Sequence, residues 1–568
     1  MKRLTTDQMT LLDHFYHWED QRPEAVFMRQ PFGPLWTEVT WREAGETVRR
    51  MAAALQRLGL RPGDVVATYS KNCYHWVLAD LAVMMGGFVS APLYPNLTGP
   101  QLGEVLRLSG AKLLFAGKLE EWAKPARFLP EGLPTIAFPH YNGNARVEAD
   151  YQWDELVQAS APIAGNPRRQ LDELWTIIYT SGTTGTPKGV MHTFRAPTAL
   201  MENERKHRNL RVFAGEEHRF FSYLPLNHIA ERIIVEGAAL MTGGTISFAE
   251  SLDTFARNLQ ETRPTLFMAV PRIWTKFQQG IFERLPPKTL RTLLGIPVVS
   301  SLVKNKIKKG LGLRDTRVTL TGAAPTPDPL KEWYQNLGIT LQEVYAMTEN
   351  CGGCTLMPLD GVKAGTVGRP LPNVRVKVDP ETEEVLMSAP WIMQGYYQDE
   401  QRTREVLENG WLRTGDRGRL TEDGYLALSG RVNDTFKSAK GKFIVPAPME
   451  WGFAENPLVE QVCVTGLALP QPMALLVLSE IGKDTDPTEV EESLTGTMEA
   501  INQTLSSFER LHRLVIMDEP WEVENGLLTP TLKIRRNVLH QRYNHHFQEW
   551  YQHPGPIVWA RMGKPVSR

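Results

Sequence analysis

The sequence predicts an α/β protein with a large amino-terminal body and a smaller carboxy-terminal lobe. Three features support this prediction. Short β-rich runs alternate with stretches of helical periodicity, residue-by-residue alternation begins near Leu371, and new strands and helices begin after Gly430. We expect layered α/β subdomains, a small β-rich subdomain at about residues 365–430, and then a mobile α+β lobe.

The body contains β-rich runs separated by a helical pattern. The predicted strands lie in DVVATYS (64–70), KLLFAG (112–117), TIIYT (176–180), RVTLTGAA (317–324) and LQEVYAMTE (341–349). In TVRRMAAALQRLGL (47–60), apolar residues recur at steps of three and four, which predicts a helix. Strands that alternate with helices favour largely parallel sheets.

The last third of the chain has a different pattern. NVRVKVDPETEEVLMSAP (373–390) alternates around Pro380 and predicts an antiparallel hairpin. The polar run GRVND (430–434) predicts a boundary between residues 1–430 and 431–568. After it, VCVTGLALP (462–470) predicts a strand and TEVEESLTGTMEAINQTL (488–505) a helix.

Composition excludes several classes of protein. Of 568 residues, 42% are hydrophobic and 22% charged, as in ordinary globular proteins, and the net charge of -1 gives no reason to expect a nucleic-acid partner. Four cysteines are too few for a disulfide scaffold, and Cys351 and Cys354 lack partners for a zinc site. With no apolar span or export signal visible, we expect a cytoplasmic protein.

The segment YTSGTTGTPKG (179–189) is the strongest functional motif. It follows an apolar strand and offers backbone N–H groups, hydroxyls and one lysine to an anion, which predicts a phosphate-binding loop. It is not a Walker loop, because Gly189 stands where that pattern needs Ser or Thr after Lys188. A flexible loop without a ligand is the alternative.

This loop resembles the phosphate-binding signature of the adenylate-forming superfamily, which comprises acyl-CoA synthetases, luciferases and the adenylation domains of peptide synthetases. Five further segments between Phe221 and Arg535 match in the family's order. The resemblance implies that the loop binds ATP through Thr180, Ser181, Gly182, Thr183, Thr184, Gly185 and Lys188.

Three of these segments belong to the body. FSYLPLNHIAER (221–232) resembles a segment of long-chain fatty acyl-CoA synthetases, which implies that His228 lines the acyl site; a core histidine is the alternative. LTGAAP (320–325) and VYAMTE (344–349) resemble the family's adenine site. By that resemblance Gly322, Ala323, Ala324 and Tyr345 contact the base, Thr348 contacts the α-phosphate and Glu349 helps to hold Mg²⁺.

The remaining segments lie near and beyond the predicted boundary. WLRTGD (411–416) resembles a motif whose aspartate, here Asp416, accepts hydrogen bonds from the ribose hydroxyls, and Arg431 matches an arginine of the ribose and phosphate region. Asn433 stands at the hinge position, where the family commonly has Asp or Lys. NGLLTPTLKIRR (525–536) implies that Lys533 is the catalytic lysine; a solvated helix face is the alternative.

Together these matches imply activation of a long-chain fatty acid by ATP and Mg²⁺ to an acyl adenylate, followed by transfer to coenzyme A. Rotation of the lobe would then bring Lys437, Lys440 and Lys442 toward the CoA phosphates, although a solvated turn is an equal alternative. Transfer to a carrier protein or another nucleophile, luciferase-type oxygenation and a catalytically silent nucleotide sensor are the competing readings.

Residues 285–313 form a basic and apolar segment. They contain six basic residues, no acidic residue and many aliphatic side chains. Such a segment can rest on an anionic bilayer, which would make the protein peripheral at the inner face of the membrane. An ordinary surface helix is the alternative.

Overall fold

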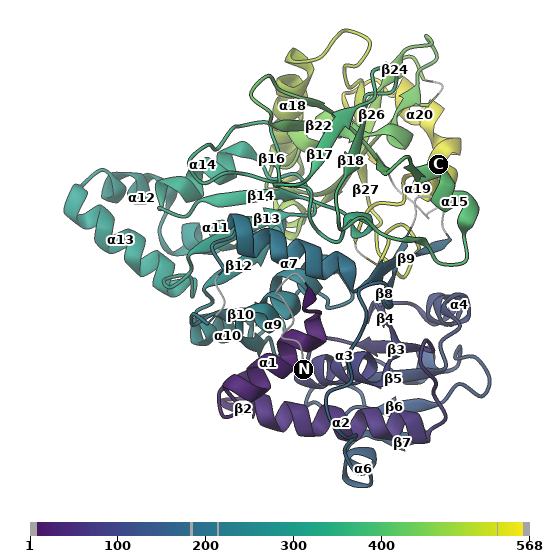
Figure 1. The fold of residues 1–568 in the computed structure, drawn as a ribbon. Helices are drawn as coiled ribbons and strands as arrows, with labels where there is room; N and C mark the ends of the chain where they lie inside the picture. Colours follow the sequence, from purple (N-terminus) through teal and green to yellow (C-terminus); the bar gives the residue numbers. More distant parts are fainter. Residues whose placement is uncertain (1–7, 182–185, 213–214, 468, 531, 561–568) are drawn as a thin grey trace. The chain divides into compact units, whose positions relative to one another are not determined.

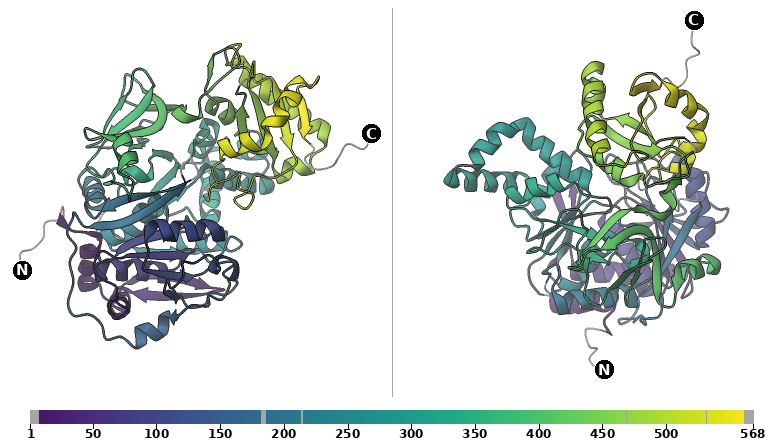
Figure 2. Two further views of the ribbon diagram at one scale, coloured as in Figure 1. Left: turned by 90° about the vertical axis from the view of Figure 1, so that its right-hand side faces the viewer. Right: turned by 90° about the horizontal axis from the view of Figure 1, so that it is seen from above.

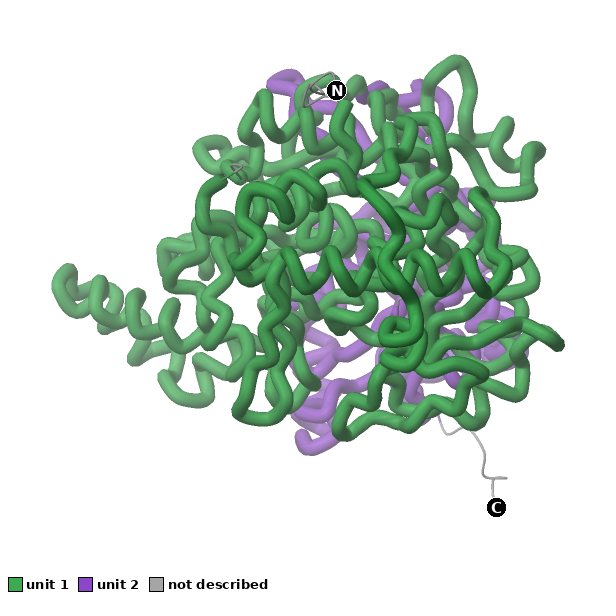
Figure 3. Tube along the Cα trace, turned by 60° about the horizontal axis from the view of Figure 1, so that its bottom comes forward, with its two compact units in different colours: residues 1–180, 187–375, 387–412 green, residues 181–186, 376–386, 413–568 purple. Residues whose placement is uncertain are grey.

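The computed structural model describes residues 8–181, 186–212, 215–467, 469–530 and 532–560. The chain divides into two compact units (Figure 3). Unit 1 comprises residues 1–180, 187–375 and 387–412, and unit 2 comprises residues 181–186, 376–386 and 413–568. The predicted boundary after residue 430 lies inside a strand of unit 2 and stays a prediction.

The largest sheet of unit 1 has the order β19-β9-β8-β4-β3-β5-β6-β7 (Figure 1). The pairs that join β8, β4, β3, β5, β6 and β7 are parallel, and β19 pairs with β9 in antiparallel orientation. Its strands are β3 (Val65–Ser70), β4 (Val89–Leu93), β5 (Leu113–Gly117), β6 (Thr135–Ala137), β7 (Tyr151–Gln152), β8 (Leu174–Ser181), β9 (Pro187–Thr193) and β19 (Gly395–Tyr396).

The central strands β3, β4 and β5 of this sheet are buried along their whole length, because helices cover the sheet. Leu102, Val105 and Leu106 of one helix pack into the same cluster as Val65 and Tyr69 of β3. The helices here are α2 (Trp41–Arg57), α3 (Tyr74–Gly86), α4 (Gly99–Ser109), α5 (Ala123–Ala126), α6 (Trp153–Gln158) and α7 (Arg195–His207).

Helix α2 begins six residues before the periodic segment that predicted it. Thr40 caps its first turn: the Thr40 hydroxyl accepts from the Glu43 amide, and the Glu43 carboxylate accepts from the Thr40 amide at 2.8 Å. This reciprocal cap satisfies backbone donors that the first helical turn leaves without partners. The capping pair, rather than the apolar pattern, therefore sets the start of the helix.

A second sheet of unit 1 has the order β10-β11-β1-β2. It carries the segment with His228, which follows β10 as a short helix and then a π-helical turn. The elements are α1 (Leu11–Gln21), β1 (Val26–Phe32), β2 (Leu35–Thr40), β10 (Arg219–Ser222), α8 (Ile229–Glu231), the π-helix η2 (Arg232–Gly237), α9 (Ala238–Thr242) and β11 (Thr245–Phe248).

A third sheet of unit 1 has the order β12-β13-β14-β15-β16, with parallel pairing among β12, β13 and β14. The strands are β12 (Leu266–Ala269), β13 (Val318–Gly322), β14 (Leu341–Tyr345), β15 (Thr355–Leu356) and β16 (Arg369–Pro370). The helices are α10 (Phe255–Thr262), α11 (Pro271–Arg284), α12 (Pro287–Leu294), α13 (Pro297–Gly310), α14 (Asp328–Asn336) and the 3-10 turn η3 (Thr348–Asn350).

A small β-rich sheet has the order β17-β18-β21-β20, and β22 pairs with β21. The division of the chain into units passes through β17, β18 and β21. As predicted, β17 and β18 are neighbours joined by the Pro380 turn. The elements are β17 (Arg375–Val378), β18 (Glu384–Ser388), α15 (Glu400–Val406), β20 (Leu407–Glu408), β21 (Trp411–Leu420) and β22 (Leu426–Arg431).

The rest of unit 2 is built on a sheet of order β25-β26-β27-β28. Its strands are β25 (Val459–Thr465), β26 (Met473–Leu478), β27 (Arg513–Met517) and β28 (Ile557–Ala560). The other elements are η4 (Val432–Asp434), β23 (Phe436–Lys437), β24 (Phe443–Ile444), α16 (Ala447–Gly452), α17 (Glu480–Asp484), α18 (Pro487–Gln503), α19 (Arg536–Tyr543), η5 (Asn544–His546) and α20 (Phe547–Gln552).

Successive residues of β26 and β27 in this sheet belong to different cores. Leu475 and Val477 pack with side chains of α19 and α20, whereas Leu476 and Leu478 pack with side chains of α16 and α18. Because neighbouring residues of a strand face opposite sides, helices cover both faces of this sheet.

The predicted α/β class, with its large amino-terminal body, β-rich subdomain and α+β carboxy-terminal region, is confirmed. In the part of the chain that the structure describes, we find no helix of the length and apolarity needed to cross a bilayer.

Candidate active site

The predicted phosphate-binding loop connects two neighbouring strands of the largest sheet in unit 1. Thr180 and Ser181 end β8, and Lys188 lies on β9. Four further residues that the resemblance predicts to bind ATP lie outside the described residues: Gly182, Thr183, Thr184 and Gly185. The strand-loop-strand arrangement therefore places Thr180 and Lys188 on adjacent strands at the two ends of the loop.

Tyr396, which sequence analysis did not identify, connects Lys188 to Glu349. The Lys188 ammonium lies 5.4 Å from the centre of the Tyr396 ring, and the Tyr396 hydroxyl donates to Glu349 Oε1 at 2.9 Å. Tyr396 reaches this position because β19 pairs with β9, where Tyr396 lies opposite Val190. A cation and a carboxylate more than 150 residues apart in sequence thus share one aromatic neighbour.

His192 and Met393 hold the segment that carries Thr348 and Glu349. His192 Nε2 donates to the Thr348 carbonyl at 2.7 Å, and the Met393 amide donates to the Glu349 carbonyl at 2.8 Å. Burial lowers the pKa of His192 to about 4, so the ring is neutral near pH 7. His192, also missed from the sequence, therefore fixes the backbone of η3 against β9.

The predicted adenine-site residues lie at the ends of neighbouring parallel strands. Gly322 ends β13 and pairs with Val344, so Tyr345 at the end of β14 lies beside it. A Cβ atom on Gly322 would lie 2.6 Å from the Val344 carbonyl oxygen, which explains glycine there. Ala323 takes a left-handed conformation with φ of 65°, and Ala324 follows it just beyond the end of β13.

Buried polar groups support the segment that contains His228. Asn72 Nδ2 donates to the Leu224 carbonyl at 2.6 Å, and Asn72 Oδ1 accepts from the Leu226 amide at 3.0 Å. Glu231 Oε1 accepts from the Tyr223 amide at 3.0 Å, and burial raises the pKa of Glu231 to about 8. His228 is half-buried and caps α8 through Nδ1, which accepts from the Ala230 amide at 3.2 Å.

Arg232, the last residue of the same motif, is fully buried in an ionic cluster. It pairs with Asp80 of α3 and, at 3.2 Å, with Glu236 one turn later. It also donates to Thr176 Oγ1 at 3.2 Å and lies 4.4 Å from the centre of the Trp175 ring. Burial raises the pKa of Glu236. Arg232 therefore ties the His228 segment to β8, the strand that enters the phosphate loop.

The structure brings Asp416 and Arg431 together within unit 2. They are register partners on β21 and β22, and Arg431 Nε lies 3.1 Å from Asp416 Oδ1. Gly415 has a φ of 71° and its amide donates to Glu384 Oε1 at 2.9 Å, which turns the chain just before Asp416. Two of the predicted nucleotide-binding side chains are thus neighbours.

Lys533 is exposed on a tight turn of unit 2. The Thr529 amide donates to the Lys533 carbonyl at 2.8 Å, and the Lys533 amide donates to Thr529 Oγ1 at 3.1 Å. Arg536 anchors the end of this turn: it donates to the Val464 carbonyl at 2.7 Å and pairs with Glu450 at 2.8 Å. Sequence analysis left Lys533 on a solvated helix face as an alternative, but the helix α19 begins only at Arg536.

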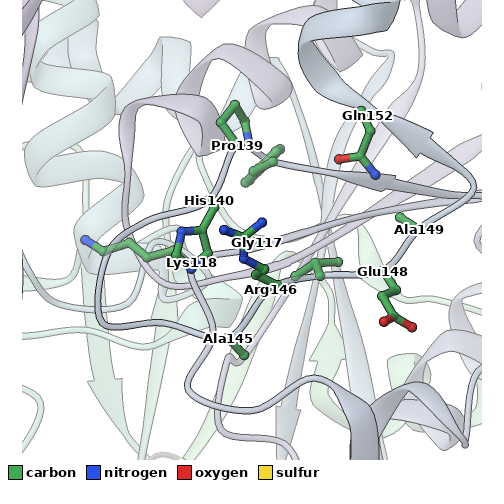
Figure 4. Close-up of a pocket in the computed structure, with 11 residues that line it drawn as sticks. Gly117, Lys118, Pro139, His140, Ala145, Arg146, Glu148, Ala149 and Gln152 are labelled. Atoms are coloured by element: carbon green, nitrogen blue, oxygen red, sulfur yellow. The ribbon is translucent and has the colours of Figure 1, made fainter.

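A hollow of about 430 Å³ lies beyond the ends of β5 and β6 (Figure 4). None of the predicted site residues lines it. Lys118 lines it but points away from Arg146, and its buried ammonium donates to the Asn72 and Ala249 carbonyls, both at 2.8 Å. Lys118 therefore supports Asn72, which in turn holds the His228 segment.

Comparison with known proteins relates the chain to a defined family. The family model described as "AMP-binding enzyme" matches residues 15–397, and the model described as "AMP-binding enzyme C-terminal domain" matches residues 433–554. The long-chain-fatty-acid-CoA ligase FadD15 of Mycobacterium bovis is 27% identical, over 93% of this chain and 94% of that protein.

Solved structures agree with this fold. The o-succinylbenzoate CoA synthetase MenE of Bacillus subtilis, in complex with its acyl-adenylate intermediate, has a TM-score of 0.73 at 22% identity, with 94% of this chain and 98% of that chain covered. The adenylation domain of a carboxylate reductase from Mycobacterium chelonae has a TM-score of 0.76 at 20% identity, with coverage of 96% and 91%.

Proposed function

The chain belongs to the AMP-binding enzyme family of adenylate-forming acyl- and aryl-CoA ligases, and we propose that it is a long-chain-fatty-acid-CoA ligase. The cluster that joins Lys188, Tyr396 and Glu349 carries this proposal, because it links a candidate phosphate cation to a candidate metal ligand. The match of FSYLPLNHIAER to the long-chain branch and the similarity to FadD15 support the choice of acid.

In the first half-reaction, the fatty carboxylate attacks the α-phosphorus of ATP and pyrophosphate leaves. Negative charge develops on the phosphoryl oxygens, so fixed cations and N–H or O–H donors lower the barrier. We assign this work to Thr180, Lys188 and the loop between them, to Thr348 at the α-phosphate, and to Lys533, which bridges the carboxylate and the α-phosphate. Gly322, Ala323, Ala324 and Tyr345 would hold the adenine, and Asp416 and Arg431 the ribose.

Glu349 is the residue that would hold Mg²⁺. Mg²⁺ is usually held by one or two carboxylates together with phosphate oxygens and water, so a single protein carboxylate is a sufficient ligand from the chain. The bound ion supplies charge neutralisation of the phosphates. A MenE structure contains both ATP and a magnesium ion. Tyr396 would orient the Glu349 carboxylate through its hydroxyl.

In the second half-reaction, the CoA thiol attacks the acyl adenylate and releases AMP. We propose that residues 431–568 act as a lobe that turns about Asn433 and withdraws Lys533 before this step. Lys437, Lys440 and Lys442 are exposed on and between β23 and β24, where they would meet the CoA phosphates. His228 would line the acyl site throughout. Asn433→Pro should slow thioester formation and leave pyrophosphate exchange intact; equal loss of both steps would contradict the hinge.

The decisive test is acid-dependent exchange of pyrophosphate into ATP, measured across straight-chain acids from acetate to oleate. We expect exchange that rises with chain length and a thioester product when CoA is added. Exchange without a CoA thioester, but with acylation of a phosphopantetheine carrier protein, would instead identify an acyl-AMP ligase. No exchange with any acid, despite ATP binding, would identify a nucleotide sensor. Light emission or oxygen uptake with a luciferin would identify an oxygenase.

A further inference from the structure

The helices α12 and α13 form a helical hairpin that extends away from the rest of unit 1 (Figures 1 and 2). The two helices pack mainly on each other, and Gly295 and Ile296 connect them. Few of their side chains are buried: Leu290 on α12 and Ser300 on α13 are the buried residues of the two helices. This pair therefore contributes little to the core of unit 1.

Large apolar side chains are exposed at the connected end of the pair. Ile296 is 47% exposed, Val298 76% and Leu302 66%. Single exposed apolar residues are normal on any protein. Three within seven residues form an apolar patch whose exposure to water is unfavourable. Val298 and Leu302 are one helical turn apart, so they share a face of α13.

The same face becomes basic toward the end of α13. Lys306 and Lys309 continue the spacing of four and three residues that begins at Val298 and Leu302, and both lysines are exposed. Residues 285–313 contain six basic residues and no acidic residue, in a chain whose net charge is -1. One helix face thus offers an apolar end and a cationic end.

Contacts at the other end hold the pair in place. Lys308, on α13, donates from Nζ to the Gly338 carbonyl at 2.7 Å. The Gln260 side chain donates to the Gly310 carbonyl at 2.6 Å. The end that carries the lysines is therefore attached to the body, while the apolar end is the part that extends outward.

We propose that α12 and α13 dock the protein on an anionic lipid bilayer, with Ile296, Val298 and Leu302 among the acyl chains and Lys306 and Lys309 at the headgroups. An apolar end next to cationic side chains matches the order of layers in such a surface. A nucleic acid would use the lysines but leave the apolar end in water. A second copy of this chain would meet the same positive charge. The proposal does not depend on the proposed acyl-CoA synthesis.

Sedimentation of the full-length protein with lipid vesicles tests the proposal. We expect binding to vesicles of phosphatidylglycerol and phosphatidylcholine in equal parts, release at high salt, and little binding to phosphatidylcholine alone. The double variant Val298→Asp and Leu302→Asp should lose binding. The double variant Lys306→Gln and Lys309→Gln should weaken it by about fivefold per lysine. These side chains are exposed, so the variants should fold as the parent does.

Matched controls use exposed residues elsewhere in unit 1. Leu252→Asp, at a side chain that is 90% exposed, and the double variant Lys112→Gln and Lys124→Gln should bind vesicles as the parent does. Equal binding to both kinds of vesicle, equal weakening by the control variants, or no binding at all would overturn the proposal. Self-association that Leu302→Asp abolishes, without vesicle binding, would identify a second copy as the occupant instead.

Discussion

The segments that carry His228 in unit 1 and Lys533 in unit 2 use charged residues in opposite ways. In the first, Glu231 and Arg232 are buried and His228 is half-buried. In the second, Lys533 is exposed on a turn, and Arg536 behind it is the residue held by ion pairs. In both segments an arginine anchors the chain and leaves a different side chain for the proposed chemistry.

The difference lies in the cost of removing charge from water. A buried ion is tolerated only with partners, and Arg232 has two carboxylates, a hydroxyl and an aromatic face. Lys533 is exposed, so its charge is not removed from water and needs no buried counter-ion. A charged residue in a motif can therefore have a structural or a chemical role. Here the buried Arg232 has the structural role, and the exposed Lys533 has the proposed chemical role.

Removal of the buried anchor should have the largest effect. Arg232→Met leaves Asp80 and Glu236 without their cation, so we expect the free energy of unfolding to fall by about 3 to 5 kcal/mol. Urea denaturation followed by tryptophan fluorescence measures it. Arg404→Met removes an ion pair whose members are both largely exposed and should cost less than about 1 kcal/mol. Similar losses for both variants would contradict the structural role of Arg232.

Loss of the exposed lysine should act on chemistry instead of stability. Lys533→Ala should reduce ATP–pyrophosphate exchange by about a hundredfold to a thousandfold, because one preorganised charge donor is lost. Urea denaturation should be unchanged, and transfer of a preformed acyl adenylate to CoA should be spared. Lys483→Ala, at another exposed lysine of unit 2, is the control. If Lys533→Ala impaired the transfer to CoA as much as the exchange, Lys533 would not be specific to adenylation.

The buried histidine of the site gives a pH dependence that sharpens the contrast. The folded protein protonates His192 near pH 4, whereas the unfolded chain protonates it near 6.5. The contribution of His192 to the free energy of unfolding is therefore fully present above about pH 6.5. It falls as the pH drops toward 4, by up to about 1.4 kcal/mol per pH unit. His14 and His75, whose pKa values burial lowers to about 4 and 3, add to the slope.

His192→Asn should remove the contribution of His192 to the pH dependence of the free energy of unfolding. The asparagine amide keeps a donor for the Thr348 carbonyl. Urea denaturation at several pH values between 4 and 6.5 measures it. The exposed His207 offers the control variant His207→Asn, which should keep the parent's slope. An unchanged slope in His192→Asn would show that its protonation is not linked to folding.

The smallest effect is expected at Tyr396. Tyr396→Phe removes the hydrogen bond to Glu349 and keeps the ring beside Lys188, so pyrophosphate exchange should fall by about fivefold, which corresponds to about 1 kcal/mol. A raised requirement for Mg²⁺ in the same assay would point to Glu349. Tyr397→Phe, at the next position in the chain, should behave as the parent. Equal effects of the two variants would contradict a specific role of the Tyr396 hydroxyl at Glu349.

Local patterns were sufficient to predict the strands and the general class of fold. β3, β5, β8, β13 and β14 each coincide with a predicted β-rich run, because hydrophobic pattern and strand propensity agree there. Helix α2 was predicted with a later start, since its cap depends on Thr40 and Glu43 rather than on periodicity. The helices α12 and α13 appeared in sequence as one basic and apolar segment, and the break at Gly295 was not recognised.

The supporting residues of the site could not be predicted in this way. Tyr396 acquires its place only when β19 pairs with β9, and Asp80 meets Arg232 across 152 positions of sequence. His192 binds a backbone carbonyl, for which no side-chain motif exists. Family resemblance supplied the groups proposed to touch substrate, whereas the groups that hold them depend on long-range pairing that local patterns do not encode.

The sheet of β25 to β28 has a consequence for any motion of unit 2. Its two faces are each closed by helices from within the unit, so its interior is complete in itself. A module of this kind can change orientation as a solid piece, with rotation confined to a few backbone bonds and without exchange of interior side chains. Substitutions in its interior would then lower the stability of the module and leave the axis of its rotation unchanged.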